Sequence, residues 1–402
     1  MPVIYLDHAA STRPDDEVID AMVEVMRTAW ANPSSQHPQG AAARTVLATA
    51  RARVLAALGD RAEGGVGDLL WTSGCSESDA IAVLGTMRQR PGALVLSAIE
   101  HAAVSAPAAE LAALGRTVVQ VAPGADGILE PEVVAEAAAV NGAAIVAVVM
   151  VQNEVGLVQP VSAIASAVRK RCPQCHIHVD AAQAFGKVPL AVTTLGADSV
   201  ALAAHKLAGP KGVGALWLRH GVALSPLWAG GGQQGGMRGG TQDAPAAAGF
   251  GIAAERAARD LSVMRARWLE LASTITTTLD ARGVAYRQLV PDQRRSPHIL
   301  ALAFAGVPAS ALRTVLASRG VSISTGSACA ERDTKKSVML ELLGLAPDAG
   351  MCRLSFGRDT TQFDVTIAAG LLADVVGELA RPAVGPTTGP GTVPATGPQT
   401  RG

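Results

Sequence analysis

The hydrophobic pattern along the chain alternates between short apolar runs and longer amphipathic segments. The runs "DLLWTSG", "ALVLSAIEH" and "AAIVAVVMVQNE" end in small or polar residues, and helical patterns follow them over residues 77–88, 102–114 and 160–170. Strands that are apolar along their whole length and alternate with helices are typical of a mostly parallel sheet covered on both faces. The sequence therefore predicts an α/β fold.

A second set of elements follows a long helical pattern. Between residues 176 and 218 the strand patterns "HIHVDAAQ", "DSVALAAHK" and "GVGALWLR" come close together, and residues 243–281 then form one extended helical pattern. Beyond it lie the strand patterns "HILALAF", "VSIST" and "CRLSFG", with helices near 309–317 and 361–380. A chain of 402 residues is too long for a single core. We therefore expect a large domain followed by a smaller α/β domain.

Composition and charge exclude several classes of function. Lys+Arg and Asp+Glu each total 34, so the formal net charge of zero gives no electrostatic reason to expect direct contact with nucleic acid or an anionic membrane. No apolar run approaches the roughly 18 residues of a membrane span, and the start "MPVIYLDHAAST" has no leader pattern. Five cysteines are an odd number at low density, which argues against a disulfide framework. We expect a cytoplasmic protein.

Polar side chains follow several of the predicted strands at the point where each strand ends. Ligands of open α/β sheets bind outside the carboxyl ends of the strands, so we expect these side chains to line one site. They are Ser76, His101, Asn153, Asp180, His205 and Lys206.

Lys206 and Asp180 are the most informative pair among them. Lys206 follows a strand of small apolar residues, where desolvation lowers the pKa of its amine and frees a nucleophile for a carbonyl group. Asp180 emerges from an apolar strand, where a carboxylate needs a partner such as a pyridinium N–H. An amine and an acid so placed predict pyridoxal phosphate as cofactor. The alternative for Lys206 alone is a solvated lysine at a strand end.

The stretch "TSGCSESDAIAVLG" predicts a cradle for the phosphate of that cofactor. Gly74 permits a tight turn, Ser76 offers a hydroxyl, and a helix from about Glu77 points its free N–H groups at the anion. The alternative is that Ser76 caps the helix with no ligand present. His101, at a neighbouring strand end, could stack on the pyridine ring and pass protons, or could be an ordinary hydrogen-bonded histidine.

Cys329 lies in "VSISTGSACAERDTKKSV", between a Gly/Ser turn and a run of charged residues. A structural cysteine is usually flanked by apolar residues, so this setting indicates an accessible thiol. Gly326, Ser327 and the polar segment 330–337 favour a mobile loop, which suits a nucleophile that carries a group from one place to another. The alternative is a surface thiol with no task.

The other cysteines carry weaker signals. Cys172 and Cys175 have CxxC spacing beside His176 and His178, a pattern that a zinc site could use. A structural zinc site usually draws on a second pair of ligands, and the sequence offers none, so we predict solvent-exposed loop thiols and no metal. Cys352 precedes an apolar strand and is predicted to lie in the core.

The motifs of the chain resemble those of cysteine desulfurases, in the same order and almost to residue 380. They are "YLDHAAST", "NPSSQH", "TSGCSES", "EHAAV", "QNEVGLVQP", "HVDAAQAFGKVPL", "AHKLAGPKGVGAL", "GGGQQGGMRGGT", "STGSAC" and "LSFGRDTT". Among these enzymes the chain is similar to the branch with an "SGSAC" active-site loop.

The resemblance implies a fold-type I, pyridoxal phosphate-dependent transferase that forms a homodimer with active sites at the subunit interface. Its large domain would contain a mostly parallel seven-stranded sheet. The implied organisation is an arm over residues 1–14 that joins the small domain, a cofactor-binding domain over 15–255, a small C-terminal domain over 256–381 that carries the Cys329 loop, and a disordered tail rich in Pro, Gly and Thr over 382–402.

The resemblance also implies roles for individual residues. Lys206 would form the Schiff base, Asp180 would pair with the ring nitrogen and His101 would stack on the ring. The remaining contacts to the cofactor would come from Gln183 at the ring hydroxyl, from Cys75 (backbone), Ser76 and His205 at the phosphate, and from Thr241 of the other subunit. Asn153 and Arg358 would bind the substrate carboxylate, for which a planar guanidinium is well suited.

Some positions depart from the family pattern. Cys75 and Ser76 stand where Ala-Thr is usual, and Ala203 replaces a serine that contacts the phosphate. The stretch "GGGQQGGMRGGT" lacks a usual Glu-Arg pair, and "AERDTKKSV" replaces small residues and Leu-Glu-Pro after the nucleophile. The last two changes lie where partner proteins dock, so they concern the sulfur acceptor.

The implied activity converts L-cysteine to L-alanine and leaves a persulfide on Cys329. The acceptor protein stays open between an iron–sulfur scaffold, a tRNA-thiolating enzyme and a DNA phosphorothioation system. Two alternatives remain: a related pyridoxal phosphate lyase or aminotransferase, such as one acting on selenocysteine, and an inactive scaffold of the same fold within a sulfur-transfer complex.

Overall fold

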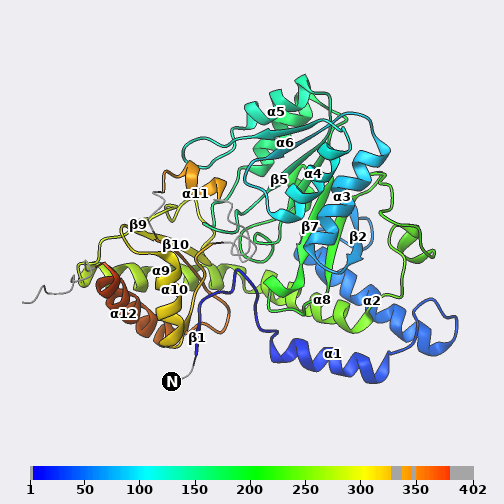
Figure 1. Ribbon diagram of the computed structural model, residues 1–402. Coiled ribbons are helices and arrows are strands. Elements are labelled where there is room, and N and C mark those ends of the chain that lie inside the picture. The colour runs from blue at the N-terminus through cyan, green and yellow to red at the C-terminus, as the bar shows by residue number, and fades with distance from the viewer. Residues whose placement is uncertain (1–2, 327–336, 346–349, 381–402) are drawn as a thin grey trace, which may run out of the picture.

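The computed structural model describes residues 3–326, 337–345 and 350–380 (Figure 1). Two expectations from the sequence, the mobile loop that carries Cys329 and the disordered tail over 382–402, lie outside the described residues.

A seven-stranded sheet forms the centre of the large domain. Its central strands are buried along their whole length. Apolar residues fill most of their positions, whereas one face of the strand His176–Asp180 carries His176, His178 and Asp180. Neighbouring strands pair in parallel from β7 through to β4, and β8 runs antiparallel to both of its neighbours. The prediction of a mostly parallel sheet is confirmed. The strand order is β2 (Gly67–Thr72), β8 (Gly214–Arg219), β7 (Ser199–Ala203), β6 (His176–Asp180), β5 (Ala143–Val149), β3 (Ala93–Ser97) and β4 (Val118–Val121).

Helices cover both faces of this sheet (Figure 1). One face packs against α3 (Cys75–Gln89) and α4 (Ala102–Ala113), whose apolar residues meet strands β3 and β5. The other face packs against a larger group of helices, which share one core cluster with the sheet. These are α2 (Pro38–Ala57), α5 (Pro131–Val140), α6 (Val161–Arg171) and α8 (Ala244–Arg259), with the short α7 (Val192–Leu195) beside them and α1 (Asp16–Thr28) packed on α8.

The smaller domain is built on a three-stranded antiparallel sheet in the order β12 (Gly350–Ser355), β10 (Ile299–Phe304) and β9 (Arg287–Gln288). The N-terminal strand β1 (Ile4–Tyr5) pairs in parallel with β11 (Val321–Ser322), so the start of the chain lies on this domain (Figure 1). Ile4 and Leu6 pack in the same apolar cluster as Trp268 and Phe356. The helices of this domain are α9 (Leu261–Ala281), α10 (Ala309–Ser318), α11 (Val338–Leu342) and α12 (Gln362–Leu379). The domain boundaries at residues 15 and 256 stay predictions.

The helical pattern over 243–281 divides into α8 and α9 at Asp260. This residue leaves the helical conformation, with φ −97° and ψ 5°. Arg259 binds its carboxylate at 2.8 Å and Arg358 binds it at 2.6 Å. The residue between α8 and α9 is therefore held by Arg358, which lies outside both helices.

None of the helices in the described part of the chain is long and apolar enough to cross a membrane.

Candidate active site

A cavity of ≈ 520 Å³ opens at the carboxyl ends of β5, β6 and β7, between the large sheet and the N-terminal arm. The structure brings together most of the side chains that the sequence assigned to one site. Its lining includes Cys75, Ser76, His101, Asn153, Asp180, Gln183, Ala203, His205 and Lys206. Ala9, Ala10, Ser11, Glu77, Lys211 and Arg353 also line it, and the sequence analysis did not select them.

Lys206 ends the short helical turn η1 (Ala204–Lys206) that follows β7. Its Nζ donates to the carbonyl oxygens of Ala9 at 2.6 Å and Ala10 at 2.9 Å. Burial and the nearby Arg353 lower the pKa of this amine from 10.5 to about 8. The lysine is therefore anchored by the N-terminal arm and deprotonates close to neutral pH.

Asp180 is the last residue of β6 and is 4% exposed. Its Oδ1 accepts hydrogen bonds from the Ala182 N–H at 2.8 Å and from the Cys75 thiol at 3.5 Å. In the described part of the chain no group bonds to the other oxygen, Oδ2. One carboxylate oxygen thus remains available at the wall of the cavity.

Gln183 is held from both ends of its amide. Its Nε2 donates to the carbonyl oxygen of Ala9 at 2.7 Å, and its Oε1 lies 3.2 Å from Nε2 of His298. These contacts fix the orientation of a side chain that lines the cavity beside Asp180.

The first turn of α3 faces the cavity. Its N-cap is Gly74, with no side-chain cap, and the helix begins at Cys75 rather than near Glu77. The expectation that Ser76 caps the helix is wrong, because Ser76 already lies in the first turn. A Cβ added at Gly74 would meet no atom within 4 Å, whereas one added at Gly214 would lie 2.7 Å from the Gly74 Cα. The turn at Gly74 therefore packs closely against Gly214 of β8 on one side, and space remains on the side toward which a Gly74 Cβ would point.

His101 is the N-cap of α4. Its Nδ1 accepts a hydrogen bond from the Ala103 N–H at 3.1 Å. Nδ1 is therefore unprotonated, and the neutral ring carries its proton on Nε2. His101 lines the cavity with a donor nitrogen not used by the helix.

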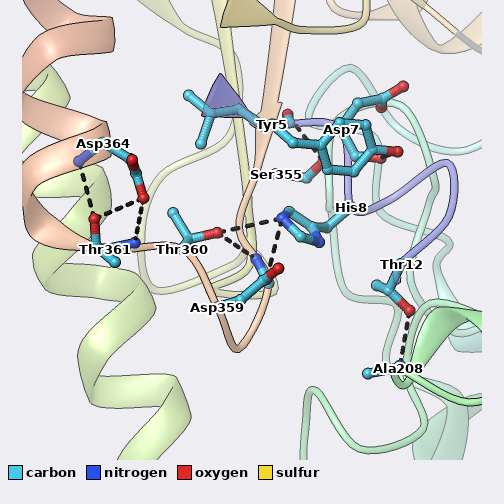
Figure 2. A network of polar contacts seen from close by, with 12 residues as sticks. Tyr5, Asp7, His8, Thr12, Ala208, Ser355, Asp359, Thr360, Thr361 and Asp364 are labelled. Carbon is cyan, nitrogen blue, oxygen red and sulfur yellow. Dashed lines mark hydrogen bonds and ion pairs between the residues drawn. The ribbon is translucent and has the colours of Figure 1, made fainter. Parts of the chain in front are cut away.

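The N-terminal arm also holds His205. Its Nδ1 lies 3.3 Å from Ser11 Oγ, and its carbonyl oxygen accepts from Thr12 Oγ1 at 2.6 Å. The same hydroxyl accepts from the Ala208 N–H at 2.7 Å (Figure 2). Burial and the nearby Lys206 lower the pKa of His205 to about 4. His205 is therefore a neutral hydrogen-bonding group at physiological pH.

The arginine at the cavity is Arg353 and not Arg358. Arg353 lies in β12, is 2% exposed and donates to Asp7 Oδ1 at 2.7 Å and to the carbonyl oxygen of Asn153 at 2.8 Å. Arg358 instead pairs with Asp260 at 2.6 Å and lines a different cavity. The structure thus places Arg358 outside the cavity that Asp180 and Lys206 line together, and its assignment to the substrate carboxylate stays a prediction. The sequence signal that could have indicated Arg353 is a charged residue inside an otherwise apolar strand.

Polar contacts fasten the arm to the small domain (Figure 2). Nε2 of His8 lies 3.3 Å from Thr360 Oγ1 and 3.6 Å from Asp359 Oδ1. Within the arm, the Tyr5 hydroxyl contacts the carbonyl oxygens of Asp7 and Ser11. The segment that binds Lys206 is therefore held by the domain that supplies Arg353.

Thr241, expected to serve the site of another subunit, is exposed and does not line the cavity of its own chain. Its assignment to a partner's site stays a prediction.

The remaining cysteines lie away from this cavity. Cys352 is fully buried, as predicted. Cys175 is not a solvent-exposed thiol, because it is 1% exposed in the main core, where burial raises its pKa. Cys172 is half-buried. Among the described residues, the only group spaced like metal ligands is Cys75, Asp79 and Asp180, which does not include the CxxC pair.

Comparisons with known proteins agree with this geometry. Residues 4–367 match the family model described as aminotransferase class-V. The chain is 33% identical over 380 residues to "Cysteine desulfurase IscS 1" of Archaeoglobus fulgidus, covering 93% of this chain and 97% of that protein. It is 34% identical over 383 residues to the cysteine desulfurase of Rhodobacter capsulatus, covering 94% and 97% of the two chains.

Solved structures show the same fold. A NifS-like protein superposes with a TM-score of 0.86 at 28% identity and covers 94% of this chain and 100% of its own. DndA from Streptomyces lividans superposes with a TM-score of 0.71 at 32% identity, covering 87% and 99% of the two chains. The chain therefore belongs to the class-V aminotransferase family and, within it, to the cysteine desulfurases.

Proposed function

We propose that the cavity binds pyridoxal phosphate and that the chain uses it to take sulfur from L-cysteine. The products are L-alanine and a persulfide on Cys329. The observation that carries this proposal is the meeting of Lys206, Asp180 and the N-terminus of α3 at one cavity, because an amine, an acid and an anion site are what this cofactor needs.

The residues present fit the cofactor. The first turn of α3 lines the cavity with its N-terminal end, and the space in front of Gly74 is open to a phosphate group. His205 and Ser76 add polar groups there, and Lys211 adds a positive charge. Oδ2 of Asp180 is the free acceptor for a ring N–H, and His101 and Gln183 line the wall beside it. When bound, pyridoxal phosphate supplies an aldehyde that condenses with amines and a cationic ring that stabilises negative charge at Cα.

Lys206 moves the proton in the reaction. Its pKa of about 8 leaves a fraction of the side chain as the neutral amine at physiological pH. A neutral amine accepts the Cα proton of the substrate and returns it later, and this exchange is most efficient when the pKa lies near the working pH. The carbonyl oxygens of Ala9 and Ala10 hold the protonated form in place.

Arg353 binds the substrate carboxylate in place of Arg358. Its guanidinium is buried and lines the cavity, and Asp7 and the Asn153 carbonyl fix its orientation. A planar guanidinium held in this way can bind a carboxylate through two parallel hydrogen bonds. Asn153, which lines the same wall, is the second group that we assign to the substrate.

Cys329 belongs to a segment whose two ends lie beside the cavity. On one side, Ser324 pairs with Arg353, and on the other Ser337 hydrogen bonds to Glu154, the neighbour of Asn153. We assign Cys329 as the nucleophile. Its thiolate attacks the substrate sulfur, the Cβ–S bond breaks and the S–S bond forms. The overall change turns cysteine and the enzyme thiol into alanine and the enzyme persulfide.

The proposed enzyme is a homodimer that completes each site with Thr241 of the other subunit. The identity of the protein that accepts the sulfur stays open between the three classes given above.

The experiment measures alanine and sulfide released from L-cysteine by the protein loaded with pyridoxal phosphate, in the presence of a thiol reductant. We expect C329A to keep the absorbance of the bound cofactor and to lose sulfide release. The control C172A, a half-buried thiol outside the cavity, should keep both. Alanine formation by C329A at the rate of the wild type would contradict the assigned nucleophile.

A further inference from the structure

Three side chains that can ligate a metal ion meet at the wall of the cavity. Cys75 and Asp79 lie four residues apart in α3, so their side chains share one face of the helix, and Asp180 ends β6. The sulfur of Cys75 and one carboxylate oxygen from each of the two acids all lie within 4.8 Å of one another. Cys75 and Asp180 line the cavity, whereas Asp79 is fully buried. The proposed function uses Asp180 but gives no task to the Cys75 thiol or to Asp79.

The spacing of two of these atoms fits a single metal ion. The sulfur of Cys75 lies 3.5 Å from Oδ1 of Asp180. In a tetrahedral site with a Zn–S bond of about 2.3 Å and a Zn–O bond of about 2.0 Å, the sulfur and the oxygen stand about 3.5 Å apart. The two side chains are therefore already spaced as neighbouring ligands of one ion.

Asp79 adds a buried oxygen without a partner. The residue is 0% exposed, and its Oδ2 makes no hydrogen bond within the described part of the chain. A carboxylate oxygen that is buried and unpaired is costly, and a bound cation removes that cost. This unpartnered oxygen is a second sign of a ligand, independent of the spacing between Cys75 and Asp180.

The other oxygen of Asp79 is held from behind. Oδ1 lies 3.0 Å from Nε2 of His178, and Nδ1 of the same ring lies 2.8 Å from Ser199 Oγ. Side chains that ligate a metal are commonly oriented by a hydrogen bond of this kind on the side away from the ion. The contact with His178 therefore fixes the carboxylate while leaving Oδ2 available.

The ligand set selects the class of metal. A thiolate favours zinc and other soft or borderline ions over Mg²⁺ and Ca²⁺, which prefer oxygen ligands alone. Zn²⁺ binds sulfur and carboxylate oxygen together, and with three protein ligands it keeps one position for water. Because two of the ligands line the cavity, an ion and its water can enter from there.

A nearby cation balances the charge of such a site. One thiolate and two carboxylates exceed the charge of a divalent ion by one negative charge. Lys206 is close enough to interact electrostatically with both Cys75 and Asp180, and its ammonium group offsets the excess.

We propose that Cys75, Asp79 and Asp180 form a zinc site of the apoprotein, and that Zn²⁺ bound there weakens the binding of pyridoxal phosphate. When the ion binds, the Cys75 thiol releases its proton to solvent and its sulfur bonds to the metal, with no transfer of electrons. A carboxylate bound to a metal is a weaker acceptor for a ring N–H, so the two ligands oppose each other through Asp180. The effect on the cofactor rests on the proposed function, whereas the zinc site itself does not.

The first test titrates Co²⁺, a spectroscopic probe for zinc sites, into the cofactor-free protein in the presence of a phosphine reductant. A thiolate bound to Co²⁺ gives an intense charge-transfer band in the near ultraviolet. We expect this band to reach full height at one equivalent in the wild type and in the control C172A, and to be absent in C75A. C172A removes one thiol of the CxxC pair, the other place where thiolates could hold a metal.

Displacement of the bound Co²⁺ by Zn²⁺ then gives the zinc affinity. Changes behind a metal ligand already cost about 10- to 100-fold in affinity, so loss of a ligand in C75A should cost about 100-fold or more. D79N replaces one carboxylate oxygen by a neutral amide and keeps an acceptor for His178, so we expect a smaller loss of at least about tenfold.

Several outcomes would overturn the zinc site. A band of wild-type height in C75A, or equal zinc affinities of C75A and the wild type, would show that Cys75 is not a ligand. Loss of the band in C172A would place the metal at the CxxC pair instead. Far-ultraviolet circular dichroism checks that each variant is folded, and C75A decides the matter if D79N is not.

The second test measures the Kd of pyridoxal phosphate from its absorbance, with and without one equivalent of Zn²⁺. We expect zinc to raise this Kd by about tenfold in the wild type and to leave it unchanged in C75A. An equal Kd for the wild type with zinc still bound would contradict the opposition between the two ligands. Failure of the metal-free wild type to bind pyridoxal phosphate would instead contradict the proposed function, and the cobalt spectra would still decide the zinc site.

Discussion

Nη2 of Arg353 lies 2.7 Å from Oδ1 of Asp7, so the N-terminal arm and strand β12 meet at the edge of the cavity. The same arm binds Lys206 through the carbonyl oxygens of Ala9 and Ala10. One short segment therefore orients both the amine that moves the proton and the guanidinium assigned to the substrate. Docking of the arm on the small domain is what completes the site.

Replacement of Arg353 by lysine should weaken the binding of L-cysteine. Lysine keeps the charge but cannot form two parallel hydrogen bonds with a carboxylate, and it cannot bond to Asp7 and the Asn153 carbonyl in the same geometry. We expect kcat/KM for L-cysteine to fall by about 10- to 100-fold, mainly through KM, in steady-state assays of alanine formation.

The matched control is R358K. Arg358 pairs with Asp260 and does not line the cavity, so its replacement should leave KM within about twofold of the wild type. A larger rise in KM for R358K than for R353K would restore the assignment made from the sequence.

Lys187 is a buried amine, and the free energy that its burial costs the folded state should depend on pH. It is 4% exposed, its Nζ has no partner among the described residues, and burial followed by the charge of Lys206 lowers its pKa from 10.5 to about 7. Below about pH 7 the lysine is protonated in both the folded and the unfolded state, and the full cost of burying its charge is present. Between about pH 7 and 10.5 the folded state has released a proton that the unfolded state still holds. The stability of the wild type therefore rises with pH in this window.

The variant K187M should remove this dependence. We expect it to exceed the wild type in free energy of unfolding by roughly 3 to 5 kcal/mol near pH 6, with the difference shrinking toward pH 10.5. Urea unfolding at several pH values measures this difference. K170M, at an exposed lysine, serves as the control and should show no such trend. A difference between K187M and the wild type that is independent of pH would show that Lys187 is not buried in its charged form.

Gly357 makes room for His8. A Cβ added at Gly357 would fall on the imidazole ring of His8, which binds Thr360 on the same loop. We expect G357A to lower the free energy of unfolding by about 1 to 3 kcal/mol, because overpacking displaces the ring and the arm that carries it. Urea unfolding measures the loss.

The double variant H8A/G357A tests the cause. Removal of the ring leaves space for the added methyl group, so the double variant should lose less stability than the sum of the two single variants. Strict additivity would show that the cost of G357A does not come from His8.

Much of this structure could be predicted from the sequence, because the same hydrophobic pattern that shows the strands also shows which polar residues lie at their carboxyl ends. Asp180 ends a buried strand, Lys206 and His101 each lie a short turn beyond one, and the carboxyl ends of parallel strands meet at one edge. Their meeting at one cavity therefore depends only on the alternation of strands and helices, which the hydrophobic pattern shows.

The positions that the sequence could not place depend on tertiary contacts. Arg353 and Arg358 are five residues apart around the end of β12. Arg353 is held at the cavity by an ion pair with Asp7, which is far away in the chain, whereas Arg358 pairs with Asp260. Cys175 is buried because the Cys172–Cys175 turn, closed by a 3.0 Å backbone hydrogen bond, leads it into the core at the start of β6. No local pattern reports such contacts.

Reduction of the holoenzyme with borohydride, followed by peptide mass spectrometry, tests the central claim most directly. Lys187, Lys206 and Lys211 all lie near the site, but only Lys206 is anchored by the arm at the cavity that it shares with Asp180. Our account predicts the reduced pyridoxyl group on the peptide that contains Lys206 and its loss in K206A. A pyridoxyl group on Lys187 or Lys211 of the wild type, or on no lysine at all, would contradict it.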